Sequence, residues 1–372
     1  MKQLLCGLLA ALLLTGSGAA LELSAPSALL MEKETGAVLY EKDPHAKLEP
    51  ASVTKIMTIL LTMEALDQGK LRPDTLISAS AHACSMGGSQ IWLKEREVMP
   101  VTDLLKAVCV VSANDCAVAL AEAISGSEEA FVELMNKRAG ELGMADTHFV
   151  NATGLPAAGH LTSAHDIALM SRELILHHPQ IRDYTTIWMD TLRGGASSLV
   201  NTNKLIRFYQ GATGLKTGST DAARFCLSAT AEREGMELIA VVLKCPTSKE
   251  RFRDAQALLD QGFASHALWH AALDPAPDPV PVTLGTEASV SAVLGEGSAL
   301  LVEKGRATQL TQTLELPESV SAPIVKGQQL GTLSVSDDGR ILARIPLLAD
   351  SDVPKVTYLQ LLERLLRTAF LG

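Results

Sequence analysis

The chain lacks the features of nucleic-acid-binding, metal-dependent or membrane-spanning proteins. Its 372 residues carry a formal net charge of −10, so there is no basic excess to bind a polyanion, and we expect no nucleic-acid partner. Histidine, cysteine and acidic residues nowhere have the spacing of metal ligands, and we expect neither a metal nor another cofactor. The apolar run Leu4–Leu14 is too short to cross a bilayer.

Cysteine is scarce, and its spacing forms no framework. With Cys6 set aside in the amino-terminal segment, an odd number of cysteines remains, so we do not expect a disulfide scaffold. Cys109 and Cys116 lie on a stretch with helical periodicity, at a separation that places both on one face. We interpret them as small, buried apolar residues.

The amino terminus has the pattern of a secretory signal. Lys2 supplies the positive start, Leu4–Leu14 the apolar centre, and Gly18, Ala19 and Ala20 the small-residue cleavage site. We therefore expect residues 1–20 to be removed from an exported protein that works at the outer face of the cytoplasmic membrane.

What the chain does contain is three short motifs in a fixed order. They are Ser-x-x-Lys at Ser52 and Lys55, Ser-x-Asn at Ser112 and Asn114, and Lys-Thr-Gly at residues 216–218, and each pattern occurs once. Each motif alone is weak, because short polar strings recur by chance. Together they supply a nucleophile, a base, a hydroxyl–amide pair and a cationic strand, as a penicillin-recognising serine acyl-transfer enzyme requires.

The first motif predicts an activated serine on a buried helix. Residues 51–66 are apolar nearly all round, which is typical of a buried helix, and positions three apart share a helix face. Ser52 would lie in the first turn, where free N–H groups favour developing negative charge. Burial and the nearby Lys216 would lower the pKa of Lys55 and let it act as a base. The alternative, a helix cap followed by a surface lysine, is disfavoured by the other two motifs.

The second motif predicts two groups that face the substrate. Ser112 and Asn114 follow an apolar helical run and precede another, so they mark a break between helices. We expect Ser112 to relay a proton to the leaving amine and Asn114 to hydrogen-bond the substrate amide. Plain helix capping is the alternative, and both roles can coexist.

The third motif predicts a strand that lies beside the substrate. Lys216 opens an extended segment, and such a strand can pair with an extended peptide. Gly218 has no side chain to block the approach. We expect Lys216 and Thr217 to meet the terminal carboxylate of the substrate.

These motifs and their surroundings resemble the low-molecular-mass penicillin-binding proteins, the serine D-alanyl-D-alanine carboxypeptidases. The resemblance covers nearly the whole chain and includes the segments 50–58, 112–115, 214–220 and 258–263. It implies an α+β catalytic domain of the β-lactamase/transpeptidase type, with an antiparallel sheet between helices. It also implies an enzyme that removes the terminal D-alanine from peptidoglycan stem peptides and is acylated by β-lactams.

The resemblance further implies roles for single residues. Ser52 would carry the acyl group, with Lys55 as the base. The backbone N–H groups of Ser52 and Ser219 would form the oxyanion hole. Arg251 would help to bind the substrate carboxylate, although its charged neighbours also allow a solvated position on a helix face.

Other functions are compatible with the same motifs. A D,D-endopeptidase would use the same residues, and the sequence leaves it open. A class A β-lactamase needs a glutamate to activate the deacylating water, whereas the loop 151–163 contains no acidic residue. A non-catalytic penicillin-binding wall protein would have lost a motif residue, and none is lost.

The rest of the chain predicts a spacer and an anchor. We expect the catalytic domain at 21–273 and a stiff linker at 274–281, where four of eight residues are proline. Short alternating segments in 282–350 predict a small β-sandwich without catalytic residues. Residues 353–372 predict an amphipathic helix with basic residues on its polar face, which suits an anionic membrane surface. A helix docked on the β domain is the alternative.

Overall fold

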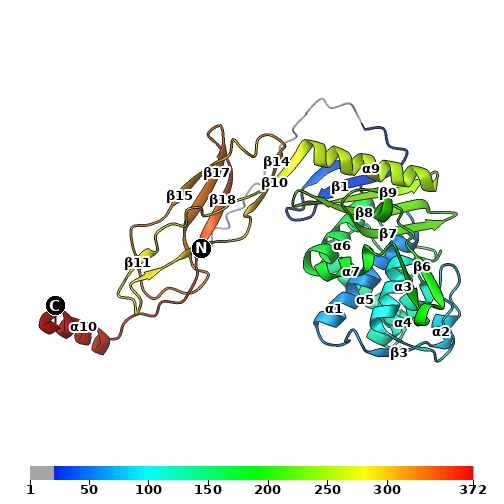
Figure 1. Cartoon of the computed structure of the whole chain (residues 1–372), viewed down its shortest axis with the longest axis horizontal. Coiled ribbons are helices and arrows are strands. Elements are labelled where there is room, and N and C mark those ends of the chain that lie inside the picture. Colours follow the sequence, from blue (N-terminus) through cyan, green and yellow to red (C-terminus); the bar gives the residue numbers. More distant parts are fainter. Residues whose placement is uncertain (1–20, 372) are drawn as a thin grey trace, which may run out of the picture.

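The computed structural model describes residues 21–371, and the predicted signal segment lies outside that range. The chain forms a large mixed domain, a smaller β domain and a terminal helix, arranged along one long axis (Figure 1). In Figure 1 the large domain lies at the right, the β domain at the left, and the terminal helix at the far left.

A five-stranded antiparallel sheet forms the centre of the large domain, in the order β2-β1-β9-β8-β7. Its strands are β1 Ser27–Glu32, β2 Val38–Lys42, β7 Ala212–Thr220, β8 Arg224–Arg233 and β9 Met236–Cys245. Strands β1 and β2 form an antiparallel hairpin at the start of the domain. Strand β7, which carries the Lys-Thr-Gly motif, lies at one edge of the sheet.

Helices cover both faces of this sheet because its inner strands are apolar on both sides. Ile239 and Val241 of β9 pack into the cluster formed by α1, α3, α4 and α6, whereas Leu238 and Val242 pack against α9 (Figure 1). The longer helices are α1 Lys55–Asp67, α3 Val101–Val110, α4 Asn114–Ser125, α5 Glu128–Glu141, α6 Ala164–His177 and α9 Ser248–Ser265. The predicted α+β architecture is therefore confirmed.

Short elements connect these helices and strands. The one-turn helices are α2 Ala81–Cys84, α7 Arg182–Thr185 and α8 Leu205–Phe208, with 3₁₀ turns η1 Ala51–Thr54, η2 Pro179–Ile181 and η3 Arg193–Gly195. Two small hairpins pair β3 Leu76–Ser78 with β4 Val98–Pro100 and β5 Met189–Leu192 with β6 Ser197–Val200. The cysteines in the described part of the chain are free, and Cys109 and Cys116 are buried, as predicted.

The small domain contains two sheets of its own, of order β12-β11-β16 and β13-β18-β17-β15, and a further strand, β14, that pairs with a strand outside them. Its strands are β11 Val280–Thr283, β12 Ser289–Val290, β13 Ala292–Leu294, β14 Ala299–Glu303, β15 Thr311–Glu315, β16 Val320–Ser321, β17 Gln329–Asp337 and β18 Arg340–Ala349. The predicted linker 274–281 is too long, because β11 begins at Val280. Val280 and Val282 point into the core while Pro281 points outward, so the proline is compatible with the strand.

The two domains are joined by a strand pair in addition to the connecting segment 271–279, which contains no helix or strand. Strand β10, His266–His270, begins where α9 ends and pairs with β14 of the small domain. The backbone N–H of Lys304 donates to the Ser265 carbonyl at 2.8 Å, and its Nζ lies 3.2 Å from a Glu234 carboxylate oxygen. Strand β10, which precedes the predicted boundary at 273, therefore belongs to the junction between the two domains.

The chain ends in helix α10, Tyr358–Leu371. The helix begins later than the predicted 353, because Val353 is buried in the small domain and bridges to Ile324. Tyr358 and Leu359 are 80% and 76% exposed, so these side chains do not dock on the small domain. No helix in the range 21–371 is long and apolar enough to cross a bilayer.

Candidate active site

Ser52 and Lys55 meet at the start of the buried helix. The Lys55 Nζ lies 3.0 Å from the Ser52 Oγ and donates to the Thr153 carbonyl at 2.7 Å. Ser52 lies in the 3₁₀ turn η1 rather than in regular α-helix, because Ala51 before it has a φ of 49°. The side chains are nonetheless in contact, so the predicted serine–lysine pair is confirmed as a geometric unit.

The surroundings of Lys55 favour its neutral form. The side chain is fully buried, and this burial holds its pKa well below the usual value for lysine. The positive charge of Lys216 lowers the pKa further, and Asp115 opposes both effects. A neutral amine that donates one hydrogen to Thr153 keeps a lone pair for the Ser52 hydroxyl proton, as a general base requires.

A close loop contact positions the carbonyl that holds Lys55. Gly154 has a φ of +79°, and a Cβ at this position would lie 1.9 Å from the Ala51 carbonyl oxygen. The Thr58 Oγ1 donates to the Ala152 carbonyl at 2.7 Å, which fastens the same loop to α1. Only glycine fits at position 154, and this fit brings the Thr153 carbonyl onto Lys55.

Ser112 and Asn114 present free polar atoms between α3 and α4. The Asn114 Nδ2 donates to the Gly87 carbonyl at 2.6 Å. Within the described residues, the buried Ser112 Oγ and Asn114 Oδ1 have no hydrogen-bond partner. Neither side chain caps a helix, so the capping interpretation is wrong. Unsatisfied buried polar atoms are rare in native proteins, and a substrate can satisfy these two.

The Lys-Thr-Gly strand lies against the serine turn. A Cβ on Gly218 would be 2.6 Å from the Pro50 carbonyl oxygen and 3.0 Å from the Ser52 nitrogen. The missing side chain therefore makes room for the serine turn, which corrects the prediction that it makes room for substrate. The Thr217 Oγ1 donates to the Thr202 Oγ1 at 2.7 Å, and Ser219 follows at the exposed end of β7.

Lys216 belongs to this strand, and its side chain is buried. Its Nζ donates to the Thr217 carbonyl at 3.0 Å. Burial lowers the pKa of Lys216 to about 7; the Cys109 thiol opposes this shift, and the positive charge of Arg251 adds to it. Lys216 therefore acts on the neighbouring Lys55 through its charge, in addition to the expected role in carboxylate binding.

Arg251 is not a surface charge. It is 7% exposed on α9, and its Nη1 donates to the Gly218 carbonyl at 3.0 Å. Its guanidinium carbon also lies 4.8 Å from the ring centre of Phe252 and 5.5 Å from that of Phe225. The solvated interpretation is therefore wrong, and Arg251 is fastened to the Lys-Thr-Gly strand.

Several supporting residues were not identified from the sequence. The Thr153 carbonyl accepts a hydrogen bond from Lys55, and the Thr202 hydroxyl accepts one from Thr217. Neither threonine belongs to a recognisable motif. The Asp115 carboxylate accepts from the backbone N–H groups of Ile91 and Leu93, and so fixes the loop that passes Asn114. The position of Asp115 directly after the Ser-x-Asn motif was the only sequence feature that could have indicated this supporting role.

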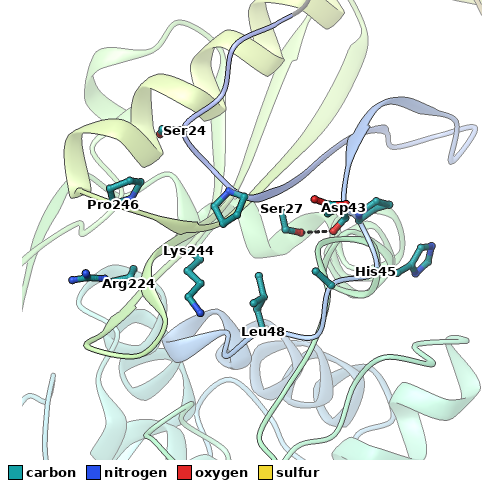
Figure 2. A pocket seen from close by; sticks show the side chains of 11 residues that line it. Ser24, Ser27, Asp43, His45, Leu48, Arg224, Lys244 and Pro246 are labelled. Carbon is teal, nitrogen blue, oxygen red and sulfur yellow. Dashed lines mark hydrogen bonds between the residues drawn. The ribbon is translucent and has the colours of Figure 1, made fainter.

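A large cavity in the catalytic domain is separate from these residues. It has a volume of about 890 Å³ and lies between the start of β1 and the end of β9 (Figure 2). Figure 2 shows Arg224 and Lys244 on one side of it and Asp43 and His45 on the other. No motif residue lines this cavity, so it does not contain the serine–lysine pair.

Comparison with known proteins shows the family. Residues 15–247 match the family model described as D-alanyl-D-alanine carboxypeptidase. The chain belongs to this family. Residues 274–355 match the model of the penicillin-binding protein 5 C-terminal domain, which accounts for the small domain of this carboxypeptidase.

Relatives that match most of this chain agree with this assignment. D-alanyl-D-alanine carboxypeptidase DacF of Bacillus subtilis is 43% identical over 325 residues, covering 86% of this chain and 83% of the relative. Penicillin-binding protein 5 of Haemophilus influenzae has a similar structure, with a TM-score of 0.75 and 31% identity over 90% of this chain and 98% of that one. The chain is therefore a serine-type D-Ala-D-Ala carboxypeptidase.

A ligand-bound relative covers the catalytic domain. Penicillin-binding protein D2 of Listeria monocytogenes in its ampicillin-bound form has a TM-score of 0.60 and 35% identity, over 65% of this chain and 99% of that one. This relative matches the domain that carries the serine–lysine pair, whereas the Haemophilus protein matches the small domain as well.

Proposed function

We propose that this carboxypeptidase is exported and removes the terminal D-alanine from peptidoglycan stem pentapeptides through an acyl-enzyme on Ser52. The observation that carries the proposal is the buried Lys55 amine, 3.0 Å from the Ser52 Oγ. Neutral Lys55 takes the hydroxyl proton as the Oγ attacks the carbonyl carbon of the penultimate residue. The N–H groups of Ser52 and Ser219 hold the oxyanion that forms.

The intermediate then collapses with loss of D-alanine. As the C–N bond breaks, Ser112 passes the proton to the leaving amine, which its unpartnered Oγ is placed to do. Water attacks the resulting ester, releases the shortened peptide and restores the Ser52 hydroxyl. Asn114 holds the substrate amide during these steps through its free Oδ1.

Penicillins would react at the same serine. A β-lactam carbonyl can occupy the position of the peptide carbonyl, and opening of its ring leaves an ester on Ser52. The ampicillin-bound Listeria relative supports this reaction for the catalytic domain. The loop 151–163 offers no carboxylate of the kind with which a class A β-lactamase activates the deacylating water, so we expect the penicillin ester to last much longer here than on such a β-lactamase.

Mass spectrometry of the purified enzyme tests the proposal. With a diacylated D-Ala-D-Ala tripeptide we expect release of D-alanine, and with a penicillin we expect a stable adduct of one molecule on the Ser52 peptide. Rapid penicillin turnover without an adduct would favour a β-lactamase. Cleavage of cross-linked dipeptides without D-alanine release from the tripeptide would favour an endopeptidase.

Arg251 should matter most for substrates with a free carboxylate. The buried guanidinium, fastened to the Gly218 carbonyl, is near the strand expected to meet the chain end. We expect Arg251→Gln to reduce kcat/KM for the free acid by about ten- to a hundredfold, and far less for the matching amide. Equal losses on both substrates would show that Arg251 only supports the strand.

Helix α10 is proposed to hold the enzyme on the membrane surface. Leu362 and Leu366 are 42% and 49% exposed, in addition to Tyr358 and Leu359 at its start. A terminal helix with exposed apolar side chains and basic residues favours binding to an anionic bilayer. Together with the export expected from the amino-terminal segment, this binding would hold the enzyme at the outer face of the cytoplasmic membrane, which we propose as its location.

Flotation with anionic liposomes tests this anchor. We expect full-length protein to float and a chain truncated after Thr357 to remain soluble and active, because Val353 and Lys355 stay within the small domain. Leu362→Glu should reduce flotation strongly because it removes apolar area. Gln360→Glu is the matched control. It adds the same charge and keeps a side-chain oxygen that can accept the hydrogen bond from the Thr357 N–H. Equal flotation of the truncated form would show that α10 is not the anchor.

A further inference from the structure

A second, smaller cavity lies directly beside the catalytic serine. It has a volume of about 290 Å³ and is bounded by Pro50 and Ala51, which immediately precede Ser52. Its other walls are the loop 154–160 and, beyond the Lys-Thr-Gly motif, Thr220 and Ala222. The cavity therefore touches both the serine turn and the far end of β7.

The direction in which the substrate lies along β7 brings its acyl side, the part before the scissile bond, to this cavity. In the proposed function, Thr217 meets the terminal carboxylate and the Ser219 N–H meets the scissile carbonyl. A substrate laid along β7 in that register runs antiparallel to the strand. The part of the peptide before the scissile bond then passes Thr220, which is one wall of the cavity. This register, and with it any role of the cavity in substrate binding, rests on the proposed function.

The walls of the cavity carry one negative charge. Leu155, Pro156 and four alanines make much of the surface apolar, and Glu49 is its single acidic residue. The Glu49 side chain is half-buried, and within the described residues its carboxylate has no hydrogen-bond or ion-pair partner. A partly desolvated, unpaired carboxylate strongly favours a cation over a neutral or anionic group.

The histidine in the wall does not supply a competing charge. The His160 Nε2 lies 2.8 Å from the Thr54 Oγ1, and its Nδ1 accepts from the Val150 N–H at 3.1 Å. Both ring nitrogens are therefore engaged within the protein. Burial also lowers the pKa of His160 to about 4, so the ring is neutral at neutral pH. Among the residues that line the cavity, Glu49 is therefore the one that carries a charge at neutral pH.

We propose that Glu49 and this cavity form a specificity subsite for a positively charged side chain on the acyl side of the scissile bond. The aliphatic part of that side chain packs on Leu155 and Pro156, and its ammonium group donates to the Glu49 carboxylate. Glu49 does not touch the reacting atoms. It selects the peptide and positions it along β7.

The test compares two substrates that differ in one charge. They are a D-Ala-D-Ala peptide preceded by an Nα-acetylated lysine with a free ε-amine, and the same peptide with that amine acetylated. We expect kcat/KM of the wild-type enzyme to favour the free amine by about tenfold. Glu49→Gln should bring the ratio of the two values to about one, and Glu49→Lys should invert it.

Asp221→Asn is the matched control. Asp221 follows Thr220 and carries the same charge, but it does not line the cavity. Its replacement should leave the ratio as in the wild type. An equal loss of preference in this variant, or an unchanged ratio in Glu49→Gln, would overturn the subsite. Raised salt should shrink the wild-type ratio without any substitution, because an ion pair near the surface is screened.

Failure of the subsite and failure of the proposed function give different results. If neither peptide loses D-alanine and penicillin leaves no adduct on Ser52, the carboxypeptidase chemistry is wrong. If both peptides lose D-alanine at equal rates in the wild type, only the subsite is wrong. The penicillin adduct also reports, for each variant, that the catalytic residues are still assembled.

Discussion

Ser52→Ala should abolish both D-alanine release and covalent labelling by penicillin. The Oγ is the atom that forms the ester, and in serine peptidases its removal costs roughly six orders of magnitude in turnover. Mass spectrometry of the penicillin-treated variant should therefore show the unmodified mass, and D-alanine release should fall to the background rate.

The fold should survive this substitution. The Ser52 hydroxyl contacts Lys55, and its loss leaves the apolar contacts of the serine turn in place. The unfolding temperature is the control, and it should change little. A penicillin adduct that maps to Ser112 or another serine in the variant would show that Ser52 is not the nucleophile.

Lys55→Met should lower acylation by about 10²- to 10⁴-fold, the usual contribution of a general base. Methionine fills the buried space of the lysine stem but cannot take the Ser52 proton. The Thr153 carbonyl loses its donor, which costs roughly 1–3 kcal/mol and leaves a large core intact. Stopped-flow acylation by a chromogenic β-lactam measures the effect, and near-normal acylation of the folded variant would contradict the role.

The pH dependence checks the same role. Acylation by the wild-type enzyme should rise with pH as Lys55 loses its proton, because only the neutral amine can accept another. Since Lys216 lowers the pKa of Lys55, Lys216→Met should move this rise to higher pH. Stability has the same sign: a lysine whose pKa falls on folding destabilises the protein most at low pH, and the penalty disappears as pH rises towards the unfolded value.

The elements that could be predicted are those with a local signal. The apolar residues of 51–66 identify a buried helix, and Asp337, Asp338 and Gly339 mark the tight hairpin between β17 and β18. The order and spacing of the three motifs identify Ser52 and Lys55 before any contact is known. Each of these signals lies within one short window of sequence.

The remaining features depend on distant segments. The Thr153 carbonyl reaches Lys55 only because Gly154 packs against Ala51, a contact between segments about a hundred residues apart. The proline pattern at 274–281 predicts a linker from local composition, whereas the burial of Val280 is decided by its partner strands. Arg251 could not be distinguished from a surface charge until α9 was placed on the sheet.

The strand pair between β10 and β14 has a mechanical consequence. A flexible tether would let the catalytic domain sample a wide volume, but β10 leaves α9 without a break and is hydrogen-bonded along its length. The small domain therefore restricts the orientation of the catalytic domain as well as its distance from α10. If α10 rests on a bilayer, Ser52 is held within a restricted range of distances from the membrane surface. The enzyme then trims only those chain ends that come within that range.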